Sequence, residues 1–387
     1  MKIVKLMFKN LFRHKLRTFL TIMGIAVAVM AFGLLRTIVT AWSAGVEASS
    51  TKRMIVRHAV SFILPLPYAY KDQLEKVPGV KSVSFASWFG GVYKDNNPED
   101  FFPRFAVDAN TFLKLYPEFI ISDDELANFQ ATRNGCVVGK KLADQHGFKI
   151  GDIIPIQGDI FPGKWEFVVK GIYKGKDRTT DETQMLFQWE YIDEALKADS
   201  PNRAGNVGWY ILDLENAGVA PDVTAAVDGM YLNSSAKTKT ETEAAFQQSF
   251  VSLSGAILSS LQVISYVIIG IILLILANTI VMSARERIRE YAVLKTLGFG
   301  NGHVASLIAG ESLLISLIGG IIGLFLAFPV IEGFGNAFPT MFPVFHMEIS
   351  TIIMCIGFSL LVGISASVFP AYRSSQMSIV DGLRQIG

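Results

Sequence analysis

The sequence contains little charge for its length, and this scarcity is the first indication of its class. Only 18% of the 387 residues are charged, whereas 51% are hydrophobic. A soluble globular domain carries about 25% charged residues, so the shortage favours a membrane protein. The formal net charge of +1 says little about partners, because opposite local charges cancel in it. No nucleic-acid partner is predicted.

The sequence also lacks the clusters that form disulfide frameworks, metal sites or catalytic centres. Its two cysteines, Cys136 and Cys355, have no CxxC or CxH spacing, and the five histidines are scattered, so no metal site is predicted. Cys136 and His146 could be read as a nucleophile and its base, but no Asn or Asp stands at the spacing of an orienting residue. We interpret Cys136 as a small buried strand residue and predict no catalytic residue.

One segment resembles a phosphate-binding loop without meeting its chemical requirement. GDIFPGKW, residues 158–165, has the GxxxxGK spacing, but Trp165 stands where a Ser or Thr hydroxyl would hold magnesium. A proline also lies inside the loop. We interpret the segment as a turn between strands, and we predict that the chain binds no cofactor of its own.

Long apolar runs are abundant. A helix that crosses the bilayer needs about 20 apolar residues, and four segments reach this length: residues 18–42, 255–283, 304–330 and 349–370. The first run could instead be a cleaved secretory signal ending near Ala41-Trp42-Ser43. Signal peptides have an apolar region of about 7–15 residues, and this run is longer, so we favour a retained first crossing.

Lys and Arg residues set the predicted orientation of these crossings. Residues 1–17 hold six basic residues and no acidic one, and residues 284–303 and the tail 371–387 are also basic. The loop 331–348 has neither Lys nor Arg. Because basic loops stay in the cytoplasm, both termini and residues 284–303 are predicted to be cytoplasmic. Residues 43–254 and 331–348 are then extracytoplasmic.

Residues 43–254 alternate between strand-like and helix-like patterns. The chain is therefore predicted to be a membrane protein with four transmembrane α-helices and a large extracytoplasmic α+β domain inserted between the first and second helices. A polar helix from about Thr240 is expected to run into the second crossing. Strands are expected at 81–89, 101–107, 135–138, 153–157, 165–173 and 207–214, and helices at 70–77, 109–116, 139–146, 190–198 and 221–231.

Two features of the third crossing attract attention. Glu311 is a carboxylate inside an apolar run, and such groups can mark ion or proton paths. A proton-coupled transporter would have several, so we favour a polar contact between helices or with the basic belt. Gly319, Gly320 and Gly323 include a GxxxG spacing that allows close helix approach, which predicts packing within or between subunits.

Charged residues crowd the loop 284–303. On a continuous helix, Arg285 and Arg289 stand at i,i+4, and Glu286 can pair with Arg289 at i,i+3. A membrane anchor would need only a few cations. The added carboxylates and the apolar residues from Tyr291 to Leu297 favour docking onto a protein.

Several motifs together resemble one family. RERIREYAVLKTLGFG at 285–300 resembles the cytoplasmic signature of MacB-type (FtsX-like) ABC transporter permeases. Residues 8–27 are similar to the family's amphipathic entry helix, assigned here to 1–17, and its first crossing. Residues 310–323 resemble the third crossing and 370–385 the tail. Residues 135–156 resemble the second outer subdomain, so the resemblance covers nearly the whole chain.

The resemblance implies that residues 284–303 are a coupling element seated on a separate ABC ATPase, which binds the ATP and magnesium. Two ATPase copies and a second permease copy, in a homodimer or heterodimer, are the implied partners, together with membrane lipids and, in some members, an extracytoplasmic adaptor. The residues carried over as ATPase-coupling are Arg285, Glu286, Arg287, Arg289, Glu290, Tyr291, Leu294, Lys295, Leu297 and Gly298.

Two functions remain open at this point. The chain is expected to be a permease subunit that drives movement of its extracytoplasmic domain to export or extract a lipid, lipoprotein, peptide or drug. The alternative is a non-transporting, regulatory permease that acts on an extracytoplasmic protein. Four crossings with a large outer domain favour export, and the coupling motif disfavours a stand-alone receptor. The expected location is the bacterial cytoplasmic (inner) membrane, as a multi-pass protein.

Overall fold

The structure is a computed structural model that describes residues 14–94, 97, 100–177, 179–338, 342 and 344–378. The chain divides into two compact units. A helical unit contains residues 1–41, 254–336 and 345–387, and an α+β unit contains residues 42–253 and 337–344. Most of the predicted entry helix 1–17, and the tail from residue 379, lie outside the described residues.

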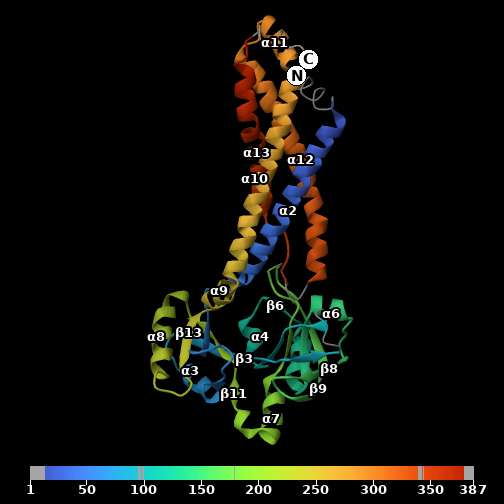
Figure 1. The fold of residues 1–387 in the computed structure, drawn as a ribbon. Helices are drawn as coiled ribbons and strands as arrows, with labels where there is room; N and C mark the ends of the chain where they lie inside the picture. The colour runs from blue at the N-terminus through green and yellow to red at the C-terminus, as the bar shows by residue number, and fades with distance from the viewer. Residues whose placement is uncertain are drawn as a thin grey trace. The chain divides into compact units, whose positions relative to one another are not determined.

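Four helices are long and apolar enough to cross a membrane (Figure 1). They are α2 (Lys15–Ala48), α10 (Gly255–Glu286), α12 (Asn301–Ala337) and α13 (Ile349–Ser375). The loop predicted from residue 331 starts later, because α12 continues to Ala337. Pro329 lies inside this helix, and Ile331 after it is buried.

A short helix, α11 (Ile288–Thr296), connects α10 to α12. Arg285 and Arg289 do not lie on one continuous helix, because Arg287 between them leaves the helical conformation with φ −108° and ψ 12°, so the i,i+4 alignment considered from the sequence does not form. At the other end of α11, Gly298 has φ +90°, a conformation that favours glycine. The Phe299 amide donates to the Leu294 carbonyl at 3.1 Å, which completes a Schellman-type helix end.

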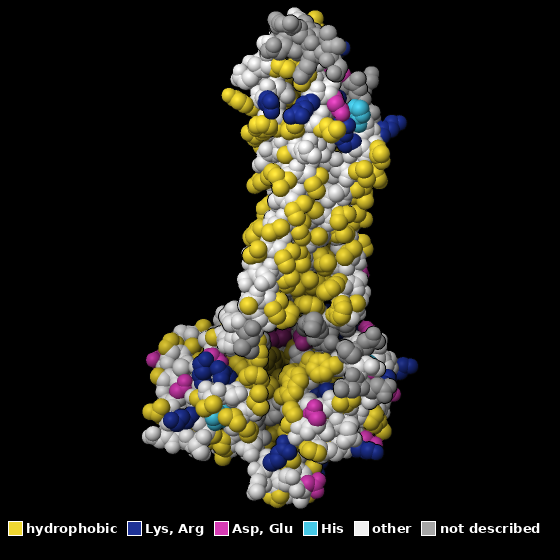
Figure 2. Space-filling view, viewed as in Figure 1, with side chains coloured by type: hydrophobic (Ala, Val, Ile, Leu, Met, Phe, Trp, Pro, Cys, Tyr) yellow, Lys and Arg dark blue, Asp and Glu magenta, His cyan; other side chains and the backbone are white. Residues whose placement is uncertain are grey.

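The helical unit packs around apolar residues that include Ile25, Leu276, Ile308 and Val362. The rings of Phe32 and Phe358 meet edge to face with centroids 5.0 Å apart. Figure 2 shows apolar side chains over the visible face of these helices, with charged side chains gathered toward the end that holds α11. This distribution fits helices that contact lipid along most of their length.

The α+β unit is built on a sheet that has eleven strands among the described residues, in the order β13-β1-β12-β3-β5-β10-β7-β9-β8-β4, with β6 paired to β9. Most neighbours are antiparallel, but β5–β10 and β7–β9 are parallel. The strands are β1 (Arg53–His58), β3 (Val80–Trp88), β4 (Gly91–Tyr93), β5 (Arg104–Val107), β6 (Phe119–Ile120), β7 (Gly135–Gly139), β8 (Ile153–Gly158), β9 (Gly163–Gly175), β10 (Met185–Gln188), β12 (Trp209–Leu214) and β13 (Thr238–Thr242).

Helices cover this sheet, and two core clusters lie on its faces. Successive residues of β3 point to opposite sides, so Phe85 enters one cluster and Ala86 the other. A small second sheet pairs β2 (Leu66–Pro67) with β11 (Asn206–Val207). The helices are α3 (Lys71–Leu74), α4 (Phe112–Leu115), α5 (Asp123–Ala131), α6 (Lys140–His146), α7 (Trp189–Asp199), α8 (Ala220–Met230) and α9 (Glu243–Leu253), with short 3₁₀ turns at Tyr68–Tyr70, Pro201–Arg203 and Ala217–Val219.

The predicted fold class is confirmed: four candidate membrane helices carry an α+β domain inserted between the first and the second. The helix predicted at 139–146 is confirmed as α6, which Gly147 ends with φ +74°. The helix expected from Thr240 is wrong in its start, because residues 240–242 belong to β13 and α9 begins at Glu243. The strand predicted at 207–214 is interrupted at Gly208.

Candidate functional site

The residues predicted to couple to an ATPase separate into outward-facing and inward-facing sets. Arg287 and Tyr291 are buried, with 5% of each exposed, and Leu294 and Lys295 are half-buried. These four therefore offer little surface to a partner. The exposed members are Arg285, Glu286, Arg289, Glu290, Leu297 and Gly298.

Arg287 points into the helical unit and forms an ion pair with Glu311 of α12. Its Nη1 atom lies 2.6 Å from Glu311 Oε2, and Ser283 Oγ lies 3.4 Å from the other carboxylate oxygen. Both partners of the pair are buried, so removing one would leave an uncompensated charge. The intramembrane carboxylate and the charged loop thus meet in one contact, which attaches α11 to the start of α12.

Two further contacts attach the same region to the beginning and end of the chain. Arg17 of α2 donates two hydrogen bonds to Glu286, at 2.9 and 2.8 Å, and His14 Nε2 lies 3.4 Å from that carboxylate. Lys295 Nζ donates to the Met377 carbonyl at 2.7 Å. The end of α10 is therefore connected to α2, its junction with α11 to α12, and α11 itself to the segment after α13.

Burial also determines the protonation state of Tyr291 in α11. The Tyr291 side chain packs in the core of the helical unit, and burial raises the pKa of its hydroxyl to about 12. Tyr291 is consequently neutral near pH 7 and contributes packing.

The outward face of α11 is a stripe of one cation and two apolar residues. Arg289, Val293 and Leu297 follow at i,i+4 spacing and are exposed, Val293 to 48% and Leu297 to 70%. Phe299, just beyond the helix, is also exposed. We call Arg289, Val293, Leu297 and Phe299 the docking stripe. Val293 lies in the apolar segment Tyr291–Leu297 that the sequence predicted to dock, but it was not named among the coupling residues, and Phe299 was missed.

The glycines predicted to support helix packing face other helices of the same chain. A Cβ on Gly319 would lie 2.8 Å from Ile25 of α2, and one on Gly323 would overlap the Ala26 carbonyl. A Cβ on Gly320 would overlap Ser359 of α13. These glycines allow α12 to pack closely against α2 and α13 within one subunit.

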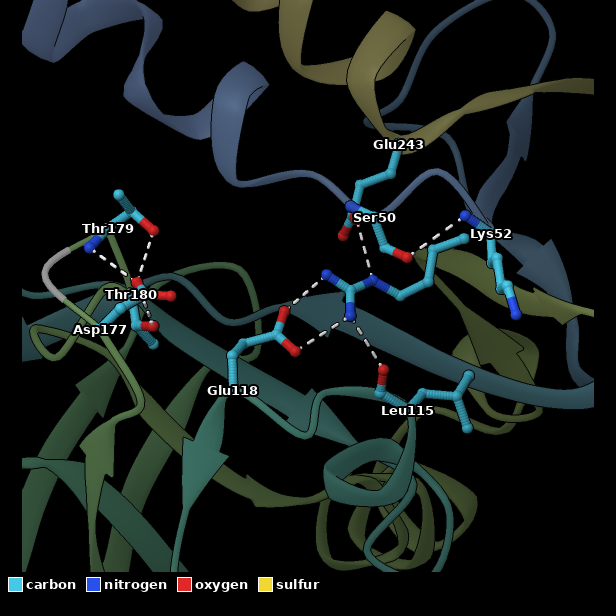
Figure 3. A network of polar contacts seen from close by, with 9 residues as sticks. Ser50, Lys52, Leu115, Glu118, Asp177, Thr179, Thr180 and Glu243 are labelled. Atoms are coloured by element: carbon cyan, nitrogen blue, oxygen red, sulfur yellow. Dashed lines mark hydrogen bonds and ion pairs between the residues drawn. The ribbon is translucent and has the colours of Figure 1, made fainter. Parts of the chain in front are cut away.

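A second polar network lies in the α+β unit, where the chain enters and leaves it (Figure 3). Arg53, the first residue of β1, is 6% exposed. Its Nε donates to Glu243 at 2.9 Å, while Nη1 and Nη2 donate to Glu118 at 3.1 and 2.5 Å. Nη1 also donates to the Leu115 carbonyl at 3.0 Å. We call Arg53, Glu118 and Glu243 the Arg53 network.

The Arg53 network joins three segments that are distant in the sequence. Glu243 begins α9 and also accepts a hydrogen bond from the Ser50 amide at 2.8 Å. The guanidinium lies 4.2 Å from the centre of the Tyr116 ring. Burial lowers the pKa of Arg53, but the hydrogen bond to Glu118 and the charge of Glu243 outweigh it, so the pKa is raised. The network therefore holds a permanent cation.

The remaining candidates have structural roles. Cys136 is fully buried in β7, and burial raises the pKa of its thiol above the usual range, which is the opposite of an activated nucleophile. GDIFPGKW forms the turn between β8 and β9, and Trp165 Nε1 donates to the Phe161 carbonyl at 2.9 Å. Among the described residues, no group of three or more His, Cys, Asp or Glu side chains could hold a metal ion.

Two families match the chain. The MacB-like periplasmic core domain family matches residues 18–230, which is more than half of the sequence, and the FtsX-like permease C-terminal family matches residues 262–379. The two matches cover all four candidate membrane helices and most of the α+β domain.

Two permeases are similar to this chain over nearly their full length, and a third relative is similar over part of its length. An uncharacterized ABC transporter permease of Methanocaldococcus jannaschii is 22% identical over 99% of this chain and 97% of its own length. The uncharacterized ABC transporter permease YvrN of Bacillus subtilis is 24% identical over 98% of each. The macrolide export ATP-binding/permease protein MacB of Neisseria meningitidis is 26% identical over 60% of this chain, which corresponds to 36% of its own length.

Among solved structures, the periplasmic region of MacB from Actinobacillus actinomycetemcomitans matches 53% of this chain and 95% of its own length, with 12% identity and a TM-score of 0.39. The extracellular domain of YknZ from Gram-positive bacteria matches 49% of this chain and 98% of its own length, with 14% identity and a TM-score of 0.34. The family matches and the four candidate membrane helices show that this chain belongs to the MacB-like periplasmic core domain family and is an ABC transporter permease of the MacB/FtsX type.

Proposed function

We propose that the chain is the permease subunit of an ABC transporter in which a separate ATPase seats on α11. The observation that carries this proposal is the docking stripe: exposed apolar side chains beside a cation, on a helix whose other charges bond internally. Exposed apolar residues beside charge are typical of a protein interface. The ATPase supplies the ATP and magnesium sites, and this chain supplies none.

The same proposal sets the orientation. Residues 284–303 and both termini face the cytoplasm, and the α+β domain lies on the outer side of the bacterial inner membrane. The basic residues around α11 and the absence of Lys and Arg from 331–348 support this orientation. The complex contains two permease chains and two ATPase subunits, and an adaptor protein on the outer side joins it where the substrate requires one.

The internal contacts supply a route for movement. The Arg287–Glu311 pair connects the junction of α10 and α11 to α12, and the Glu286–Arg17 pair connects the end of α10 to α2. Displacement of α11 by a closing ATPase therefore acts on these helices. At the other end of the route, the Arg53 network joins the segment after α2, the start of α9 and the α4–β6 region.

The task performed outside the membrane is export or extraction of a lipid, lipoprotein, peptide or drug. The MacB relatives are named macrolide export ATP-binding/permease proteins, which supports export. A regulatory permease that moves an outer protein partner without transport is the alternative. Accumulation of a labelled macrolide or lipoprotein outside proteoliposomes that contain the whole complex distinguishes the two.

Co-purification tests the ATPase seat. The ABC ATPase from the same genome that co-purifies with the unaltered chain is identified first. It is then co-expressed with the full chain and with each variant. Leu297→Asp and Arg289→Glu should each reduce ATPase recovery by at least about tenfold, since disrupting interface charge or apolar contacts costs more than 1.4 kcal/mol. Matched controls are Leu232→Asp and Lys81→Glu, which change exposed residues of the α+β domain.

The controls should retain full recovery. If Leu297→Asp and Arg289→Glu also retain it, the stripe is not the ATPase seat. Variants of Arg287 and Leu294 are unsuitable for this test, because Arg287 is buried and Leu294 packs against the helical core. Their effects would report folding.

A further inference from the structure

Residues 59–65, AVSFILP, form an exposed apolar loop directly after β1. Val60 is 79% exposed and Ile63 is 78% exposed, and Phe62 and Leu64 are each more than two-fifths exposed. No charged side chain occurs from residue 59 to residue 70. Soluble surfaces rarely present several adjacent large apolar side chains, and such patches mark contact with a partner or a membrane.

Several backbone amides of this loop donate hydrogen bonds to other groups of the protein. The Val60 amide donates to His58 Nδ1 at 3.2 Å, and the Ile63 amide donates to the hydroxyl of Ser61 at 3.2 Å. The Leu64 amide donates to the Ser61 carbonyl at 3.2 Å, and the Ala59 amide donates to the Lys237 carbonyl at 2.8 Å. Four of the amides are thus satisfied without water. Entry into lipid is costly for unsatisfied backbone groups, and these contacts reduce that cost.

A ring contact connects the loop to the helix that leads into the membrane. The Phe62 and Phe250 rings have centroids 5.3 Å apart, and Phe250 also contacts Phe246 within α9. Ser254 alone separates α9 from α10, which begins at Gly255. Phe250 precedes Gly255 by five residues, so the chain allows at most about 18 Å between the two at 3.6 Å per residue. The contact between Phe62 and Phe250 therefore lies within five residues of the start of a candidate membrane helix.

The strand that precedes the loop, β1, is held by hydrogen bonds and an ion pair to its neighbour β13. β1 pairs with β13 from Met54 to His58, and Arg57 Nε lies 2.7 Å from Glu241 of β13. β13 continues directly into α9. The apolar loop and the membrane-leading helix therefore belong to one hydrogen-bonded substructure of the α+β unit.

We propose that residues 59–65 insert into the lipid interface of the membrane that α10 enters, with Val60, Phe62, Ile63 and Leu64 among the headgroups and upper acyl chains. The occupant of this surface is the bilayer itself. The inference goes beyond the proposed function, since it depends on the membrane helices and not on an ATPase. The loop gives the α+β domain a second attachment to the membrane besides its two covalent connections.

Lipid quenching of a fluorophore tests the insertion. The full chain in nanodiscs carries bimane on Ile63→Cys or, as the matched control, on Ala198→Cys. Ala198 is exposed on α7, which lies on the opposite side of the α+β unit from α9 (Figure 1). The natural Cys136 and Cys355 are buried. Lipids brominated near the headgroup should quench position 63 at least about threefold more than position 198, because interfacial apolar groups lie about 5–10 Å deep.

A second variant keeps the test decisive. Val60→Asp adds a charge at a highly exposed position, so the fold should survive while quenching at position 63 falls to the level of position 198. ATPase co-purification should remain at the wild-type level. Equal, weak quenching at positions 63 and 198 in the unaltered loop would overturn the proposal. The proposal would also be overturned if the label at position 63 were shielded from water, not quenched by lipid, and cross-linked to a second copy of the chain.

Discussion

Arg53→Met should open the α+β domain locally, where the chain connects it to the membrane helices. The substitution removes four hydrogen bonds donated by the guanidinium. Glu243 then stays buried, with 8% of its side chain exposed, and keeps the hydrogen bond from the Ser50 amide but no longer faces a cation of Arg53. Removing one partner of a buried ion pair costs about 3–5 kcal/mol. Glu118 is 25% exposed and can be hydrated instead.

The unequal burial of the two carboxylates sets the expected order of effects. Glu118→Gln should cost about 1 kcal/mol, the value of an ordinary hydrogen bond. Arg53→Met together with Glu243→Gln should cost less than Arg53→Met alone, because no unpaired charge stays buried. A matched control is Arg57→Met, which removes a neighbouring cation of β1 that pairs with Glu241 alone among carboxylates of the described residues.

Hydrogen exchange followed by mass spectrometry measures this opening in the full chain. Amides of β1 and α9 should exchange about 100- to 3,000-fold faster in Arg53→Met, given tenfold per 1.4 kcal/mol. Amides of β8 and β9 should keep their wild-type rates. Unchanged exchange in β1 and α9 would show that the network contributes no stability. A cost for Glu118→Gln equal to that of Arg53→Met would refute the reasoning from burial.

Three further outcomes are expected. Gly320→Leu should separate α12 from α13, because even a Cβ overlaps the neighbouring serine, and the apparent Tm of the chain in detergent should fall by several degrees. Arg287→Met should lower that Tm more than Arg287→Met with Glu311→Met, since the single change leaves a buried carboxylate unpaired; equal losses would contradict this. Burial raises the pKa of Glu241, but hydrogen bonds from two cations outweigh it and the pKa is lowered from 4.5. The stability from this group is therefore present above pH 4.5 and lost as pH falls further, and Glu241→Gln should remove that acid dependence of β1 exchange.

The membrane architecture was predictable from composition and run length. Uncharged segments of this length fit neither a strand nor a surface helix, and only the first run had a competing explanation, a cleaved signal, which its length disfavoured. The helix ended by Gly147 was also predictable, since the glycine conformation ends the helix whatever surrounds it. Local signals of this kind do not depend on tertiary contacts.

The inward orientation of Arg287 was not predictable. A sequence of alternating charges indicates a solvated helix, and only the three-dimensional contact with Glu311, 24 positions away, explains why one arginine is buried. The helix breaks at the same residue, and of the expected apolar segment Tyr291–Leu297 it is Val293 and Leu297 that are exposed, whereas Tyr291 is buried. Long-range pairing also explains the missed β1 and β13, whose polar residues are held by each other.

The small residues of α12 make different kinds of contact with α13 and with α2, and the difference has a consequence for movement. Ser312 Oγ donates to the Gly363 carbonyl of α13 at 2.7 Å, and this bond fixes the register of the two helices. Against α2, by contrast, α12 presents Gly319 and Gly323 to Ile25 and Ala26. Ile25 packs over Gly319 in this contact, and packed helices of this kind accommodate the small sliding that characterises shear motions. The helices α12 and α13 can then shift along α2 together, as one unit.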